Sequence, residues 1–171
     1  MAEQLTHNST HFTAVKTPSV LVCDGVTGPA NIGGLFRLCD SFGVDRVYFC
    51  NTKVDLSSSR IKRTSRSTHQ LVSYTDDIDT LEVLKQLKKQ GYTPLALELT
   101  TKSQALEDLL IIDKKPLALF IGNEKTGISA KVLAHIDTHL HIPMQGNNSS
   151  MNVTHAAAVG LYALSLKTKY I

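Results

Sequence analysis

The sequence predicts an α/β domain in which a mostly parallel β-sheet is flanked by helices on both faces. Short β-rich runs alternate along the chain with stretches whose apolar residues recur at helical spacing. The run at 116–121 (PLALFI) is apolar throughout, as expected of a strand that is covered on both faces. Gly43 and Gly91 each follow a helical stretch, at the position where a glycine commonly ends a helix. Strands that alternate with helices are typical of βαβ units.

The N-terminal half is predicted to contain three strands and one helix. SVLVC at 19–23 is β-rich and ends at a loop rich in Gly and Pro, 24–30. Helical spacing then extends over 31–41 and places Ile32, Leu35, Phe36 and Cys39 on one side. RVYFC at 46–50 is the next strand, and a basic loop leads to a weak extended run at 70–74.

The C-terminal half continues the alternation and ends on a long apolar helix. The expected elements are an amphipathic helix at 76–90, a strand at 93–99, a short helix or helical turn at 105–110 and a buried strand at 116–121. A helix at 129–135, a short strand at 139–142 and a long helix at 152–167 follow.

Length and composition favour a single globular domain. A chain of 171 residues fits one domain, which we place at 19–171 after a flexible N-terminal segment, 1–18. No apolar run approaches the roughly 20 residues of a membrane helix, and the polar start of the chain does not resemble a secretory signal. The three cysteines are odd in number and widely spaced, which indicates reduced thiols and a cytoplasmic protein.

A basic cluster lies in a Ser-rich stretch, although the net charge of +3 is small. Its members are Lys53, Arg60, Lys62, Arg63 and Arg66, with only Asp55 of opposite sign among them. Such a run is often only a solvated surface. It also suits phosphate oxygens, which accept hydrogen bonds from basic and hydroxyl side chains alike. Arg60, Lys62, Arg63 and Arg66 are therefore our candidate RNA-binding residues.

Three loops rich in Gly, Asn and small polar residues follow predicted strands, at 24–34, 122–129 and 143–152. Ligands of open parallel sheets bind at the carboxyl ends of strands, so the three loops predict one composite pocket. The first loop lacks the GxGxxG spacing of a dinucleotide fold. In the second, Ile128 stands where a phosphate-binding loop requires lysine. Nor does the chain contain the GxSxG turn of a serine hydrolase.

Three histidines in the C-terminal half resemble a metal-binding cluster at first sight. His135, His139 and His141 are close in sequence, but no glutamate follows His135 to complete an HExxH motif. We interpret them as structural or surface histidines, and we predict no metal.

The three loops together resemble the SpoU (TrmH) family of RNA ribose methyltransferases, in the SPOUT superfamily. The family's first motif is similar to NIGGLFR at 31–37, followed by Phe42 and Gly43. Its second is similar to FIGNEKTGIS at 120–129, and its third to IPMQGNNSSMNVTHA at 142–156. The motifs occur in the family's order and spacing.

This resemblance implies a fold that hydrophobic periodicity alone does not predict, namely a C-terminal segment threaded through a deep trefoil knot. It also implies a homodimer that binds S-adenosyl-L-methionine (AdoMet) and transfers its methyl group to a ribose 2′-hydroxyl of RNA. The implied cofactor-binding residues are Leu99, Gly122, Ile142, Ser150 and Met151. The implied catalytic residues are Arg37, Asn31, Glu124, Ser150 and Asn152. A bulky residue at Gly146 is expected to crowd the cofactor loop.

Arg37 is often described as the base in this family. A guanidinium stays protonated at neutral pH, so binding phosphate and stabilising negative charge on the attacking oxygen is the other role that we consider. Asn31 is expected to cap the helix that carries Arg37.

The chain departs from the family at 63–69 (RTSRSTH), where relatives commonly show R-x-S-x-G-A. This departure puts the shape of the RNA-facing loop, and with it the substrate, in question. The small single-domain size favours tRNA over ribosomal RNA. One alternative is a catalytically inactive RNA-binding protein of the same fold, and the presence of both Arg37 and Asn31 argues against it. The other is a base-methylating knotted enzyme, but the chain lacks the glycine-rich cofactor loop and the Asp base of those enzymes.

Overall fold

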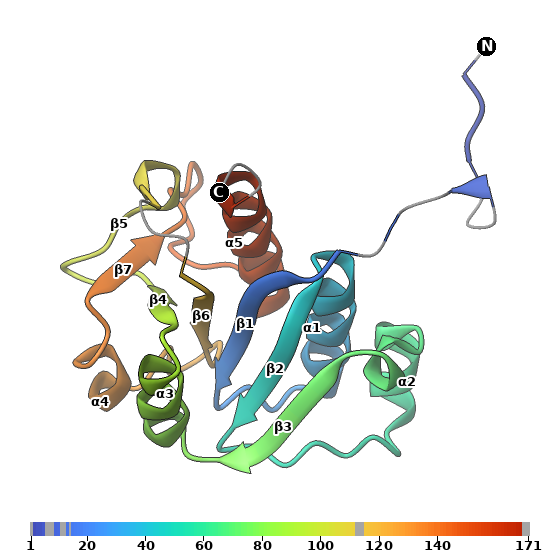
Figure 1. Ribbon diagram of the computed structural model, residues 1–171, viewed down its shortest axis with the longest axis horizontal. Coiled ribbons are helices and arrows are strands. Elements are labelled where there is room, and N and C mark those ends of the chain that lie inside the picture. The colour runs from blue at the N-terminus through green and yellow to red at the C-terminus, as the bar shows by residue number, and fades with distance from the viewer. Residues whose placement is uncertain (1, 6–8, 11–12, 14, 112–114, 169–171) are drawn as a thin grey trace.

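The computed structural model describes residues 2–5, 9, 10, 13, 15–111 and 115–168, and its centre is a seven-stranded sheet (Figure 1). The strands are β1 (Thr17–Asp24), β2 (Val44–Cys50), β3 (Ser73–Ile78), β4 (Thr93–Leu97), β5 (Gln104–Ala105), β6 (Leu117–Gly122) and β7 (Thr138–His141). Their order in the sheet is β3-β2-β1-β6-β4-β7-β5, and every pairing between them is parallel. The predicted fold class is thus confirmed for the sheet.

Helices cover both faces of this sheet (Figure 1). They are α1 (Pro29–Ser41), α2 (Ser59–Ser65), α3 (Thr80–Lys89), α4 (Ala130–Leu133) and α5 (Val153–Thr168), with short 3₁₀ turns at Thr68–Gln70 and Leu106–Asp108. One core cluster joins α1 and α5 to the sheet, and the other joins α3 and α4 to the opposite face. Leu119 belongs to the first cluster and Phe120 to the second, as the two-residue period of a strand requires. No helix among the described residues is long and apolar enough to span a bilayer.

The strand order brings distant segments of the chain together at one edge of the sheet. β6 pairs with β1 on one side and with β4 on the other, and β7 extends the sheet beyond β4. Because all strands are parallel, the loops that follow them emerge at a common edge. The second and third predicted loops follow β6 and β7, so both start at this edge.

Three predicted elements between residues 53 and 90 are wrong in position or type. Part of the expected basic loop is helical, because residues 59–65 form α2. The third strand is Ser73–Ile78 rather than 70–74, and α3 starts at Thr80 rather than at Asp76. Asp79 explains this start, because its carboxylate accepts a hydrogen bond from the amide of Glu82 and caps the helix.

Candidate active site

A cavity of about 830 Å³ opens at the carboxyl ends of β4, β6 and β7. Most of its lining comes from residues 97–100, 121–128 and 141–151. The second and third predicted loops therefore share one pocket. The first loop, 24–34, does not line it, and the segment that follows β4 takes that place. Sequence patterns did not single out this segment as a loop of the pocket, because it continues the predicted strand 93–99.

All five residues that the resemblance assigns to the cofactor line this cavity: Leu99, Gly122, Ile142, Ser150 and Met151. Leu97, Ile121 and Ile128 add apolar surface beside them, and all three are buried. Apolar side chains in a cavity wall suit an adenine ring, which needs apolar surroundings.

Gly122 is a glycine because the chain folds back onto it. A Cβ atom at this position would lie 2.1 Å from the carbonyl carbon of Gly127 and 2.2 Å from the amide nitrogen of Ile128. Gly127 itself has a φ of +66°, which closes the loop. At Gly146 a Cβ would meet no protein atom within 4 Å, so the expected effect of a bulkier residue on cofactor binding stays a prediction.

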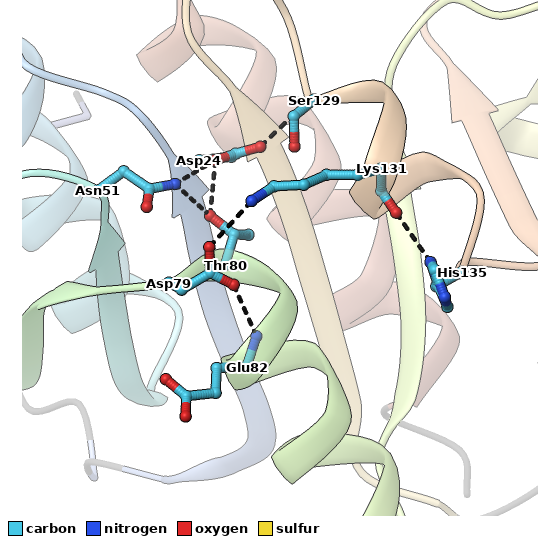
Figure 2. Close-up of polar contacts among 8 residues, drawn as sticks. All are labelled: Asp24, Asn51, Asp79, Thr80, Glu82, Ser129, Lys131 and His135. Atoms are coloured by element: carbon cyan, nitrogen blue, oxygen red, sulfur yellow. Dashed lines mark hydrogen bonds and ion pairs between the residues drawn. The ribbon is translucent and has the colours of Figure 1, made fainter.

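Two carboxylates hold consecutive amides at the end of this loop. Glu98 accepts a hydrogen bond from the amide of Ile128 at 3.0 Å, and Asp24 accepts one from the amide of Ser129 at 2.9 Å. Asp24 is 5% exposed and also accepts hydrogen bonds from Thr80 at 2.6 Å and from Asn51 at 3.0 Å (Figure 2). The loop that forms one cavity wall is thereby fixed to the ends of β1 and β4.

Three of the predicted catalytic residues are joined by hydrogen bonds. The side-chain amide of Asn31 donates to the carboxylate of Glu124, and that of Asn152 donates to the side-chain oxygen of Asn31 at 3.1 Å. Asn152 also caps α5, because its side-chain oxygen accepts the amide of Thr154 at 2.9 Å. The three predicted motifs therefore each contribute one residue to the same hydrogen-bonded group. A fourth predicted residue, Ser150, lies in the cavity wall nearby in sequence.

The predicted capping role of Asn31 is wrong. Helix α1 begins at Pro29, with Gly28 as its N-cap and without a side-chain cap. Proline suits the first helical position because its missing N–H would have no intrahelical partner there. Asn31 consequently lies inside the first turn, where its side chain is available to Glu124 and Asn152.

Arg37 stands apart from this group. It lies six residues after Asn31 on α1, a rise of about 9 Å along the helix. Its side chain is exposed and does not line the cavity. Within the described residues, its guanidinium has neither a hydrogen-bond nor an ion-pair partner.

The four candidate RNA-binding residues are exposed and lie on or directly after α2: Arg60, Lys62, Arg63 and Arg66. α2 packs closely on α1, because a Cβ at Gly33 would lie 2.7 Å from the carbonyl oxygen of Ile61. Arg66 and Ser67 both have positive φ, at +47° and +71°. Ser67 occupies the place of the glycine that relatives commonly carry.

The histidines each have hydrogen-bond partners of their own. His139 is 8% exposed and contacts the carbonyl of Ile136 at 2.9 Å and the hydroxyl of Thr100 at 2.9 Å. His141 contacts Ser103 at 3.0 Å. These contacts hold the segment that follows β4 against β7. Among the described residues, no three His, Cys, Asp or Glu side chains are placed to share a metal ion.

The three cysteines are free and buried. Burial raises the pKa of Cys39 and Cys23 far above the ordinary thiol value, and it raises the pKa of Cys50 to about 12. They are thiols at neutral pH, which excludes them as nucleophiles.

Known proteins resemble this chain over most of its length. The family described as "SpoU rRNA Methylase family" matches residues 18–162. The "tRNA (guanosine(18)-2'-O)-methyltransferase" of Thermus thermophilus is 32% identical over 83% of this chain and 71% of its own length. A "23S rRNA (guanosine(2553)-2'-O)-methyltransferase" of Bacillus subtilis is 29% identical over 85% of this chain. The chain spans only 57% of that protein's length, and it likewise spans less than two thirds of several other curated relatives.

Solved structures share the fold as well. The TrmH/SpoU tRNA modifying enzyme of A. aeolicus has a TM-score of 0.79 and 23% identity, and the match covers 92% of this chain and 78% of that one. The family match spans the motifs at 31–37, 120–129 and 142–156, whose side chains meet at the cavity and beside it. The chain belongs to the SpoU rRNA methylase family.

Proposed function

We propose that this protein is an AdoMet-dependent RNA methyltransferase that acts on a ribose 2′-hydroxyl. The observation that carries the proposal is the convergence of the three motifs. The second and third form the cavity walls, and Asn31 of the first is bonded to a residue from each of them. A volume of about 830 Å³ lies within the range of cofactor pockets.

AdoMet would lie in the cavity against Leu99, Gly122, Ile142, Ser150 and Met151 and would supply an activated methyl group. The chain's own residues must then position the ribose and accommodate negative charge on its oxygen, since a hydroxyl is too weak an acid to ionise at neutral pH. Glu124, Asn31 and Asn152 form a connected acceptor and donor chain beside the cavity, suited to orienting a hydroxyl. Arg37 would bind the neighbouring phosphate and stabilise the developing oxyanion.

A homodimer would place Arg37 where it is needed. Arg37 lies outside the cavity of its own chain, and we propose that it reaches the cavity of a second copy. The exposed side of α5 supports this assembly, because Val159, Tyr162 and Leu166 are 41%, 57% and 47% exposed and recur at helical spacing. A stripe of apolar side chains on a helix commonly marks a protein interface.

We also propose that the C-terminal segment forms the family's knot. Two features support this proposal. β7 pairs between β4 and β5, both of which precede it in the chain. The chain then crosses the cavity with residues 143–151 and returns in α5 to pack against α1 and β6.

The exposed basic residues of α2 support an RNA substrate, and the relatives bear on which kind of RNA it is. The Thermus protein, of which the chain covers the larger share, is named for tRNA, whereas the Bacillus protein is named for 23S rRNA. We propose tRNA as the substrate. The four exposed basic side chains on and directly after α2 would contact RNA phosphates, which carry no sequence information.

Two measurements test the proposed activity. Calorimetry of the purified protein with S-adenosylhomocysteine should give roughly one site per chain, unaffected by a chelator. The protein should then transfer a radiolabelled methyl group from AdoMet to unmodified tRNA, at a ribose that mapping of alkali-resistant positions identifies. Binding of RNA without methyl transfer would favour the inactive RNA-binding alternative, and transfer to ribosomal RNA alone would overturn the choice of tRNA.

A further inference from the structure

Glu98 is a cavity residue to which neither the motifs nor the family resemblance assigns a role. It follows the last residue of β4 directly and lines the cavity, between Leu97 and Leu99. Its side chain is half-buried. A half-buried carboxylate requires hydrogen-bond partners.

Backbone amides fix the orientation of this carboxylate. Its Oε2 accepts a hydrogen bond from the amide of Ile128 at 3.0 Å, and its Oε1 accepts one from the amide of Leu99 at 3.2 Å. Gly127 lies directly against it, since a Cβ there would be 2.6 Å from Oε2. The two oxygens are thus held in place by the same loops that form the cavity.

The carboxylate keeps unused acceptor capacity. An ionised carboxylate has about four lone-pair positions, and the described contacts occupy two of them. Among the described residues, no Lys, Arg or His forms an ion pair with Glu98. Two preoriented acceptor positions therefore remain beside the cavity, with the buried side chains of Leu97 and Ile128 next to them.

We propose that Glu98 binds the ribose hydroxyls of the cofactor and so selects a ribonucleoside over its deoxy forms. This inference rests on the proposed function, in which Leu99, the next residue, contacts the adenosine. A vicinal diol presents two donors on adjacent carbons, which matches the two oxygens of one carboxylate. A hydrogen bond to a charged group is among the stronger ones, so the selection should be large.

The experiment compares the dissociation constants of S-adenosylhomocysteine and of its 2′-deoxy and 3′-deoxy analogues. The wild-type protein should bind the parent compound at least about tenfold more tightly than a deoxy analogue, because the analogue lacks one hydrogen bond to a charged group. In Glu98→Ala the ratio should fall towards one. In Glu98→Gln, which keeps one acceptor oxygen, it should be intermediate. The analogues retain the amino acid end of the compound, so a contact of Glu98 with its ammonium group would leave the ratios unchanged.

Asp24→Asn is the matched control, because Asp24 anchors the neighbouring amide of Ser129 but does not line the cavity. A loosened loop would weaken binding of the parent compound and of the analogues by the same factor. This variant should therefore keep the wild-type ratio of dissociation constants. Glu98→Ala with the wild-type ratio for both analogues would overturn the inference while leaving the proposed function intact. A folded wild-type protein that binds none of the three compounds would overturn the proposed function itself.

Discussion

The side-chain amide of Asn152 donates a hydrogen bond to the side-chain oxygen of Asn31 at 3.1 Å, although 121 residues separate the two along the chain. The contact joins α1 to the start of α5, and the two helices also approach closely at Gly34, where a Cβ would lie 3.0 Å from Thr154. The asparagines therefore link the first motif to the third. The same Asn152 side chain caps α5, so it combines a structural and a positioning role.

These two roles of Asn152 can be separated by substitution. Asn152→Ala should lower the free energy of unfolding by about 1 kcal/mol through loss of the cap, and it should also reduce methyl transfer. Asn152→Asp keeps a capping oxygen but replaces the donor to Asn31 with an acceptor. Its free energy of unfolding in urea should equal the wild-type value, whereas its kcat for methyl transfer should fall. If Asn152→Asp methylates RNA at the wild-type rate, the contact with Asn31 has no part in catalysis.

Arg37→Ala should abolish methyl transfer with little change in AdoMet affinity, because the proposed role of Arg37 is to bind the phosphate and the attacking oxygen of the RNA rather than the cofactor. Arg37→Lys should restore little methyl transfer activity, since an ammonium group cannot reproduce a planar guanidinium that contacts two oxygens together. Single-turnover methylation and calorimetry measure the two effects separately. An ordinary exposed arginine predicts the opposite result: near-normal activity and a stability change within about 0.5 kcal/mol.

The two glycines of the cavity wall should respond differently to alanine. Gly122→Ala should destabilise the protein by about 2 kcal/mol or more, because the added Cβ would collide with the backbone of Gly127 and Ile128. Gly146→Ala should change stability by no more than about 0.5 kcal/mol, since space is open at that position. Thermal unfolding of both variants tests the pair, and equal destabilisation would contradict the close approach at Gly122.

The basic side chains of α2 should affect RNA binding without affecting chemistry. Replacing Arg60, Lys62 or Arg63 by Ala should raise the KM for RNA and flatten its salt dependence, while kcat is mostly kept. Lys85 and Lys89, exposed on α3 against the other face of the sheet, provide charge-matched controls. Alanine at those two positions should leave KM unchanged. A similar rise in KM for both sets would show a nonspecific charge effect.

The sheet was predictable because each central strand carries its own pattern. Buried runs such as 116–121 are apolar over their whole length, and glycines such as Gly43 and Gly91 have the positive φ that ends a helix. The region 53–79 was not predictable in the same way. α2 has only two buried residues, and the boundary of α3 depends on a side-chain cap rather than on periodicity.

The candidate site was also predictable only in part. Four of the five predicted cofactor residues and both predicted catalytic asparagines lie in the three motifs, whereas Leu99 was predicted from its place at the end of a strand. Glu98 and Asp24 were missed because their role depends on amides 30 and 105 residues away, which no local pattern reveals. The only available signal was position, since each is polar and stands at the end of an apolar strand.

Ser67 offers a test of how the altered 63–69 segment is stabilised. Its φ of +71° is a left-handed conformation that favours glycine, the residue of the family pattern R-x-S-x-G-A that the 63–69 segment resembles. The neighbouring contacts offset part of this cost: Thr68 donates to the carbonyl of Ser65 at 2.7 Å, and His69 contacts the Ser65 hydroxyl at 2.7 Å. Ser67→Gly should therefore raise the free energy of unfolding by about 0.5–1 kcal/mol.

The matched variant is Thr68→Ala, which restores the other family residue but removes a buried hydrogen bond. It should lower stability by about 1 kcal/mol, and the double variant should lie between the two single ones. Urea unfolding gives the free energy of unfolding of all three variants. The KM for RNA shows whether the 63–69 segment affects RNA binding. If Ser67→Gly is no more stable than wild type, the left-handed serine carries no strain. The segment then differs from its relatives in sequence alone.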